Sequence, residues 1–317
     1  MLSSLFGRLS GRAGSAGWLA VELGTESVRF AHVVPNGARP VVEFVEQRPW
    51  DPGNPKSLGQ MVRDLGVKHV QCTTLLRPEE YQILLVEAPA VRPEELKSAV
   101  RWRIKDMLDY HVDDATIDVL DVPMPASAGQ RGRYMYTVAA RNNAIRETIE
   151  QFAAAGLPLA VIDIPDTAQR NLAARFESDQ RGVLALTFDS LGGLLTVTFG
   201  AELYLTRRIE SSSAHLGTGG ELGLRLFERV LVETQRSLDH CERTYPFISI
   251  SRVLVSPFPG AEPLRQYLAS NLYLPVESLD IARVANLPAA AESWTDEDRV
   301  KWLKLIGAGL RVESKAL

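Results

Sequence analysis

Alternating hydrophobic and polar residues near the start of the chain predict a three-stranded β-meander with tight turns. The turns are expected at Gly24-Thr25 and at Pro35-Asn36-Gly37, where small and polar residues interrupt the alternation. The strands of this meander are expected at residues 18–23, 27–34 and 41–46. The same alternation predicts four further strands, at residues 69–76, 81–88, 116–122 and 134–139.

Helical spacing of apolar residues predicts three helices in the first half of the chain. The first begins at Pro93, which is followed by two glutamates, as is common at helix starts. Its buried stripe is expected to contain Leu96, Val100, Ile104, Met107 and Leu108. The second helix, 143–155, ends at Gly156 and is expected to bury Ile145, Ile149 and Phe152. A strand at 157–165 and a helix at 166–176 complete this half.

The pattern of strand, small polar turn and strand then starts again. Residues 182–209 predict a second meander, and a helix is expected at 221–242. The apolar face of that helix comprises Leu222, Leu226, Phe227, Val230, Leu231, Thr234, Leu238 and Cys241. A strand at 252–256 and helices at 262–272 and 296–306 complete the second half. Two halves of meander plus helix indicate an internal duplication.

Composition narrows the class of protein. With 45% hydrophobic and 23% charged residues among 317, the chain is typical of a soluble globular protein of two or three lobes. A net charge of −4 gives no overall bias toward nucleic acid. Cys72, Cys241 and the five histidines have no metal-ligand spacing, so we predict neither a disulfide nor a metal site. The lack of a long apolar run or a signal peptide favours a cytoplasmic protein.

Residues 1–16 are predicted to form a tail outside the folded lobes. Arg8 and Arg12 accompany apolar residues at helical spacing, which are Leu2, Leu5, Phe6 and Leu9. A basic amphipathic helix of this kind would rest on an anionic membrane surface or dock on a partner. The alternative interpretation is a frayed tail that ends in a Gly/Ser-rich linker.

The turns of the two meanders carry the candidate chemistry. A hairpin that binds phosphate needs small residues so that backbone N–H groups reach the oxygens, together with hydroxyls and a carboxylate that orders magnesium. The first turn offers Glu22, Gly24, Thr25 and Ser27, with Arg29 behind them. The second turn offers Asp189, Ser190, Gly192, Gly193 and Thr196. Two such hairpins that face each other across a cleft would clamp a nucleoside triphosphate.

This arrangement resembles the actin and sugar kinase superfamily, in which both halves carry a phosphate hairpin. Four blocks narrow the resemblance to the PilM family of type IV pilus assembly proteins. The blocks are LAVELGTESVRF, the segment from ILLVEAPAVRPEEL to DVLDVP, LVETQRSLDHCE and IGAGLR. Within the second block RWRIKDMLDY, together with the short second half, is most similar to MshI. MshI is the PilM-like protein of mannose-sensitive haemagglutinin (MSHA) pilus systems.

The resemblance implies an α/β, actin-like fold, which is a duplicated ribonuclease H-like fold of two lobes with an extra subdomain of the FtsA and PilM type. It assigns 17–78 and 160–180 to the first lobe, 79–159 to the inserted subdomain and 181–317 to a shortened second lobe. It implies a partner that binds between the first lobe and the subdomain, namely the cytoplasmic N-terminal tail of a PilN-like bitopic inner-membrane protein. The protein would then act at the cytoplasmic face of the inner membrane, on a pilus motor platform. Its membrane association would be peripheral, through that partner or through the tail 1–16.

Three residues of the second block are candidates for partner binding: Trp102, Arg103 and Tyr110. Exposed Trp and Arg side chains are over-represented in recognition surfaces, which favours this interpretation. The alternative is a half-buried Trp102 beside a solvated Arg103.

Several residues depart from the family pattern. Glu22 stands where the family has aspartate, and Glu26 adds a negative charge to the turn. Asp189 is separated from Gly192 by two residues, whereas the family spacing is Asp-x-Gly. Downstream, SPFPG occupies the stretch where PilM proteins have a Gly-Gly turn against the nucleotide base. Glu233 and Gly260 complete the set of candidate nucleotide contacts.

These departures favour a non-catalytic scaffold that requires no cofactor and has no catalytic residue. A degenerate site that still holds ATP or ADP with magnesium remains open, and with it the alternative function of a nucleotide-dependent switch or weak ATPase that gates the same partner. A small-molecule kinase of the same superfamily is a third reading. It would need a general-base aspartate in the cleft, which the sequence does not identify.

Overall fold

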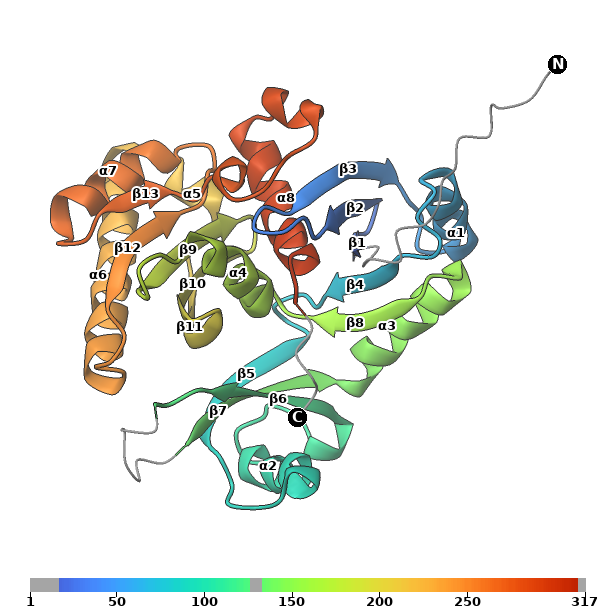
Figure 1. Cartoon of the computed structure of the whole chain (residues 1–317), viewed down its shortest axis with the longest axis horizontal. Coiled ribbons are helices and arrows are strands. Elements are labelled where there is room, and N and C mark those ends of the chain that lie inside the picture. Colours follow the sequence, from blue (N-terminus) through green and yellow to red (C-terminus); the bar gives the residue numbers. More distant parts are fainter. Residues whose placement is uncertain (1–16, 126–132, 313–317) are drawn as a thin grey trace.

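The computed structural model describes residues 17–125 and 133–312. A five-stranded sheet contains the first meander and two parallel strands, in the order β3-β2-β1-β4-β8 (Figure 1). Its strands are β1 (Trp18–Leu23), β2 (Ser27–Val34), β3 (Val41–Pro49), β4 (Gln71–Leu75) and β8 (Leu159–Asp163). The predicted tail at residues 1–16 lies outside the described residues.

The second five-stranded sheet repeats this topology in the order β11-β10-β9-β12-β13. Its strands are β9 (Gly182–Asp189), β10 (Gly192–Phe199), β11 (Glu202–Ile209), β12 (Ile250–Val255) and β13 (Val276–Ser278). In both sheets an antiparallel meander is followed by two strands parallel to its first strand or to each other. The predicted duplication is therefore confirmed at the level of strand order.

A third sheet lies apart from these two, at the bottom of Figure 1. It is antiparallel, has the order β5-β7-β6, and consists of β5 (Tyr81–Glu87), β6 (Ala115–Val122) and β7 (Tyr134–Arg141). The helix α2 (Leu96–Ile104) covers one face and buries Val100 and Ile104 against it. The helix ends earlier than predicted, so Met107 is 50% exposed and the prediction that it belongs to the buried stripe was wrong.

Two helices pack together on the outer face of the first sheet. They are α1 (Pro55–Asp64), which the sequence analysis missed, and α3 (Asn142–Ala155). A Cβ added at Gly59 of α1 would lie 2.4 Å from the Ala155 carbonyl oxygen, so the two helices approach as closely as their backbones allow. Phe152 of α3 is buried as predicted, but Ile149 is 51% exposed and that prediction was wrong.

The helices α4 (Pro165–Ala173) and α8 (Asp296–Gly309) lie between the two large sheets (Figure 1). One hydrophobic cluster joins Val33 of the first sheet, Ala185 of the second, Leu172 of α4 and Ile306 of α8. The start of α8 has a capping box between Thr295 and Asp298. This helix pair forms the contact through which the two halves share a core.

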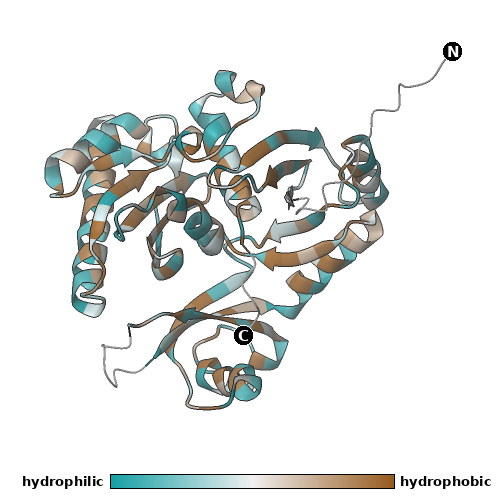
Figure 2. Cartoon of the chain, in the orientation of Figure 1, coloured by the Kyte–Doolittle hydropathy of each residue, from teal (hydrophilic) through white to brown (hydrophobic). Residues whose placement is uncertain are grey.

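Three helices cover the second sheet: α5 (Ser213–Leu216), α6 (Gly220–Thr244) and α7 (Ala261–Asn271). Phe227, Val230 and Leu238 of α6 are buried as predicted, whereas Leu222 in the first turn is 59% exposed and was wrongly assigned to the apolar face. Figure 2 shows α6 with hydrophobic and hydrophilic residues in alternation along its length, as a helix that covers a sheet requires.

The lobe boundaries inferred from the sequence stay a prediction, because α3 and α8 each contact more than one sheet. Among the described residues, no helix combines the length and apolar character needed to span a bilayer. Cys72 and Cys241 are both buried and are not paired with each other.

The contact between α4 and α8 generates a stability prediction. A Cβ added at Gly307 of α8 would lie 2.4 Å from the backbone oxygen of Ala168, so Gly307→Ala forces the helices apart. We expect it to lower the free energy of unfolding by about 1–3 kcal/mol. Gly223→Ala in α6 is the control, since no atom lies within 4 Å of its added Cβ. It is expected to gain about 1 kcal/mol from helix propensity. Urea denaturation measures both; equal stability of the two variants would contradict the close approach.

Candidate functional site

The two meander turns face one cleft of about 390 Å³ at the junction of the halves. The turn between β1 and β2 forms one side and the turn between β9 and β10 another. The remaining walls come from the carboxyl end of β4, from one face of α3 and from the start of α4 at Pro165. Lys304 of α8 reaches the cleft between the two turns. The cleft is therefore built from both halves of the duplication.

In the first turn the backbone closes on itself. Gly24 N–H donates to the Ser27 carbonyl oxygen at 2.9 Å, and an added Cβ at Gly24 would lie 2.8 Å from that oxygen. Glu22, Gly24 and Thr25 line the cleft. Glycine is thus needed here for the turn itself, whatever the cleft binds.

Two predicted members of the first hairpin lie elsewhere. Ser27 Oγ accepts from the Gln47 amide at 3.1 Å, across to β3. Glu26 lines a separate shallow hollow beside Trp50 and Asp51. Glu26 therefore adds its negative charge to this neighbouring hollow and does not line the cleft.

The carboxylate of Glu22 is neutralised within the protein. It pairs with Arg29, its cross-strand neighbour on β2, at 2.6 Å. Arg29 also donates to the Lys301 carbonyl oxygen of α8 at 3.3 Å. Burial raises the pKa of Glu22, although the cations of Arg29 and Lys304 oppose this shift. The Glu22 carboxylate is thus partly shielded from water, and the cations of Arg29 and Lys304 compensate its charge.

The second turn has a similar internal arrangement. Asp189 accepts from Leu191 N–H at 2.8 Å with one carboxylate oxygen, and the other forms an ion pair with Lys304 of α8. Leu191 is 67% exposed and its side chain lines the cleft, while Ser190 at the tip is exposed and does not. Gly192 has a φ of 138°, which closes this turn of two residues. Lys304 was missed by the sequence analysis, since a lysine on a helix is ordinarily solvated.

The other two candidates of the second hairpin belong to the core. A Cβ at Gly193 would lie 2.6 Å from the Phe188 ring, so glycine is required there by packing. Thr196 has no exposed surface and accepts from the Gln169 amide of α4 at 3.0 Å. The structure therefore contradicts the assignment of Gly193 and Thr196 to a nucleotide site.

Glu233 and Gly260 also lie outside the cleft. Glu233 of α6 pairs with Arg236 at 3.0 Å and with Arg207 at 3.8 Å. Gly260 precedes α7 with a φ of 89°, and an added Cβ would lie 2.8 Å from the Gly217 Cα. The preceding Phe258 is fully buried. These residues stabilise the second half rather than extend the cleft.

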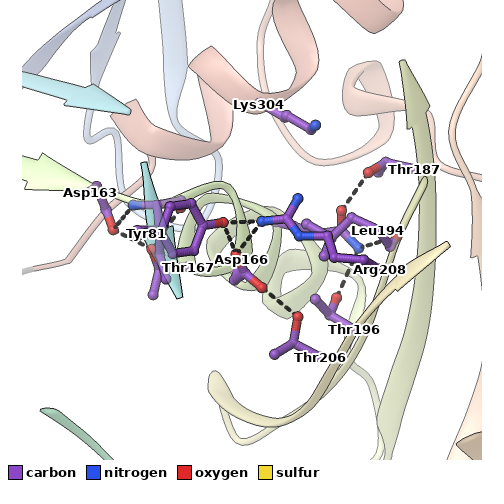
Figure 3. Close-up of polar contacts among 12 residues, drawn as sticks. Tyr81, Asp163, Asp166, Thr167, Thr187, Leu194, Thr196, Thr206, Arg208 and Lys304 are labelled. Atoms are coloured by element: carbon purple, nitrogen blue, oxygen red, sulfur yellow. Dashed lines mark hydrogen bonds and ion pairs between the residues drawn. The ribbon is translucent and has the colours of Figure 1, made fainter. Parts of the chain in front are cut away.

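A kinase would need a general-base aspartate, and the two aspartates near the centre in Figure 3 are both engaged in contacts within the protein. Asp163 accepts from Ile164 N–H at 2.9 Å and pairs with Arg311 at 3.1 Å. Asp166 has no exposed surface and accepts from Tyr81, Thr206 and Arg208. Neither aspartate lines the cleft, so neither is placed to act as the general base of a small-molecule kinase.

The residues of the cleft do not fit a magnesium nucleotide as they stand. The N–H groups of Gly24 and Leu191 donate within their own turns, and the carboxylates of Glu22 and Asp189 are paired with cations. Across residues 17–125 and 133–312, no group of three or more His, Cys, Asp or Glu side chains is placed to hold a metal ion. A phosphate would have to displace contacts that the protein makes with itself.

The candidate partner-binding residues lie away from the cleft. Trp102 on α2 is 71% exposed, with the Lys105 ammonium 5.5 Å from its ring, which excludes the half-buried alternative. Arg103 donates to the Glu87 carbonyl oxygen at 3.0 Å. The Tyr110 ring stacks under the guanidinium of Arg141 at 4.1 Å. The structure therefore brings Trp102 to the surface and leaves Arg103 and Tyr110 in local contacts.

No protein-family model and no curated protein sequence matches the chain. Among solved structures, it is similar to the PilM-PilN type IV pilus biogenesis complex, with a TM-score of 0.66 and 19% identity over 95% of this chain and 98% of that one. A second similar structure is the cytoplasmic domain of EpsL, an inner membrane component of the type II secretion system of Vibrio cholerae. Its TM-score is 0.43 and its sequence identity 14%, over 63% of this chain and 73% of that one. A third is a Bacteroides thetaiotaomicron protein with an actin-like ATPase fold and unknown function. Its TM-score is 0.48 and its sequence identity 10%, over 88% of this chain and 96% of that one.

At sequence identities between 10% and 19%, structural similarity is evidence of a shared fold and of nothing more specific. The similarity to the PilM-PilN complex spans nearly the whole of both chains, and it agrees with the repeated strand order of the two large sheets. The actin-like fold expected from the sequence is thereby confirmed.

The ion pair between Lys304 and Asp189 generates a second prediction. Lys304→Met leaves Asp189 without its cation and removes one of the charges that compensate Glu22. We expect a loss of about 1–3 kcal/mol in the free energy of unfolding, as for hydrogen bonds to charged groups. Thermal or urea unfolding gives the value.

Lys301→Met on the same helix is the matched control, because its pair with Asp298 is more exposed and is expected to contribute under about 1 kcal/mol. The variant Asp189→Asn completes a double-mutant cycle with Lys304→Met. Strictly additive losses from the two changes would mean that the ion pair stabilises nothing.

Proposed function

We propose that this protein is a PilM-like scaffold of a type IV pilus assembly platform. It binds the cytoplasmic N-terminal tail of a PilN-like inner-membrane protein and acts at the cytoplasmic face of that membrane. The observation that carries the proposal is the TM-score of 0.66 over 95% of the chain with the PilM-PilN complex. The four ordered sequence blocks support it independently, since they extend from the first hairpin to α8.

The cleft is suited to an extended peptide. Its walls combine apolar side chains such as Trp50, Leu76 and Leu191 with the hydroxyls of Thr25 and Thr148, a mixture found in sites that bury one or two side chains of a ligand. Its volume of about 390 Å³ is at the small end for ligand sites. We place the tail of the partner along α3 and the end of β4 in this cleft.

Within the pilus systems we assign the protein to the MshI branch of MSHA-type pili. The support is the RWRIKDMLDY segment and the short second half of the chain. The segment comprises the last residues of α2 and the turn that follows it, where Met107 faces solvent.

We further propose that scaffolding needs neither a bound nucleotide nor hydrolysis. The ammonium of Lys304 already supplies the positive charge between the two hairpins, and it holds Asp189 of the second turn. The alternative is a switch in which nucleotide binding gates the same partner. One observation favours that alternative: Thr25 and Lys304 both line the cleft, and both are residue types that bind phosphate.

Partner binding is tested with a synthetic peptide of the N-terminal tail of a PilN-like protein from the same organism, titrated by calorimetry into the full chain. Thr148→Arg introduces a long side chain on the α3 face that lines the cleft, and we expect the affinity to fall at least about tenfold by steric exclusion. Ile149→Arg is the matched control, because it is the next residue, is 51% exposed and does not line the cleft. An unchanged affinity in Thr148→Arg would place the peptide elsewhere.

Nucleotide independence is tested by a thermal-shift titration with MgATP. A ligand present at 100 times its Kd stabilises a protein by about 2.7 kcal/mol, so a physiological site would raise the melting temperature at millimolar nucleotide. We expect no shift. A shift that disappears in Lys304→Met would instead support the nucleotide-gated switch.

A further inference from the structure

A buried polar cluster joins three separate parts of the molecule, and we name it the joint. It consists of Tyr81, Asp166, Thr206 and Arg208 (Figure 3). Asp166 accepts from the hydroxyls of Tyr81 and Thr206 and from the Arg208 guanidinium, the last at 3.1 Å. Arg208 also donates to the Tyr81 hydroxyl oxygen, and its guanidinium lies 5.5 Å from the Tyr81 ring. Every member therefore contacts Asp166.

The members come from three elements that are distant in the sequence. Tyr81 opens β5 of the third sheet, Asp166 lies in the first turn of α4, and Thr206 and Arg208 lie on β11 of the second sheet. The Asp166 side chain is 1% exposed, whereas that of Arg208 is 39% exposed. A buried carboxylate is stable only while its donors stay in place, because water cannot replace them. The relative positions of the three elements thus decide whether Asp166 is satisfied.

The joint shares its backbone with the cleft. Glu80, the residue before Tyr81, lines the cleft and accepts from the Arg77 backbone N–H at 2.7 Å. Pro165, the residue before Asp166, lines the cleft as well. A ligand that moves the backbone of either wall of the cleft therefore acts directly beside a member of the joint, because Glu80 and Pro165 are bonded to Tyr81 and Asp166.

The third sheet has a second anchor on the second sheet that is chemically different. Tyr136 of β7 is buried and donates to the Tyr204 carbonyl oxygen of β11 at 3.1 Å. This bond joins neutral groups, and neither of its residues lines the cleft. It provides a matched comparison for the joint, because both anchors tie the same sheet to the same strand through a tyrosine hydroxyl.

We infer that the joint sets the position of the third sheet against the second half and couples this position to occupancy of the cleft. The coupling rests on the proposed function, whereas the positional role does not. Binding linkage is reciprocal, so a ligand in the cleft changes the stability of the joint by the same factor by which the joint changes the affinity of that ligand. Tyr81 is in this sense a positioning residue for a cleft that it does not line.

The first experiment needs no ligand. Hydrogen exchange of the full chain compares Tyr81→Phe, which keeps the ring and deletes one donor to Asp166, with Tyr136→Phe. We expect Tyr81→Phe to accelerate exchange about tenfold or more in residues 81–87 and 134–141, while residues 182–199 keep the wild-type rate. Tyr136→Phe should change exchange much less. Equal acceleration in all three sheets would reduce the joint to an ordinary stabilising contact and overturn the inference, as would no change.

Thr206→Val removes a different donor to Asp166 with little change of volume, and it serves as a second variant if Tyr81→Phe folds poorly. The same local acceleration in residues 81–87 is expected, because the carboxylate again lacks one donor. Exchange at the wild-type rate in this variant would also count against the joint.

The second experiment measures coupling with the PilN-like tail peptide. We expect Tyr81→Phe to bind it at least about fivefold more weakly than Tyr136→Phe, which should match the wild type. If the wild type binds the peptide and both variants bind equally well, the coupling is wrong although the proposed function stands. If the wild type does not bind, the coupling falls with the proposed function, while the exchange experiment still decides the positional role.

Discussion

The burial of α4 constrains the rest of the structure. This helix lies between the two large sheets with nearly every residue buried, yet it carries several polar side chains that must be satisfied there. Asp166 binds the third sheet and β11, Gln169 donates to the Ala185 and Leu194 carbonyl oxygens of the second sheet, and Asn171 donates to the Gly307 carbonyl oxygen of α8. One short helix thereby connects the second sheet, the third sheet and the last helix through directional bonds, which fix geometry in a way that apolar packing alone does not.

The pairing of α4 with α8 also determines what the cleft can do. Because α8 packs closely on α4, its Lys304 reaches the space between the two hairpins, where it meets Asp189. Glu22 and Arg29 make a comparable pair on the first hairpin. The charged side chains of both hairpins are thus compensated by the protein itself, which is the physical basis for proposing a scaffold on an actin-like fold.

Much of the architecture could be predicted because it depends on local pattern. The strands β1 and β2 begin and end where the alternation does, and the repeated meander led to the duplicated fold. The errors have local causes too. The helix α1 was missed although Leu58, Met61 and Val62 have helical spacing, because it is short, mostly polar and carries a central glycine. Met107 lies beyond the end of α2 and Ile149 lies on an exposed part of α3, and spacing alone reveals neither where a helix ends nor which of its residues a neighbour covers.

The sequence by itself determined the elements, the duplication and the position of the first hairpin, since these follow from side chains a few residues apart. Only the tertiary structure decided which candidate residues share a site. Lys304 and Asp189 are 115 residues apart, and Tyr81 and Asp166 are 85 apart, so no local pattern marks either pair. Thr196 and Gly193 carry the residue types of a phosphate turn, yet both are buried because both faces of β10 are covered. The residue type determines which interactions a side chain can make, whereas the fold determines whether a ligand can reach that side chain.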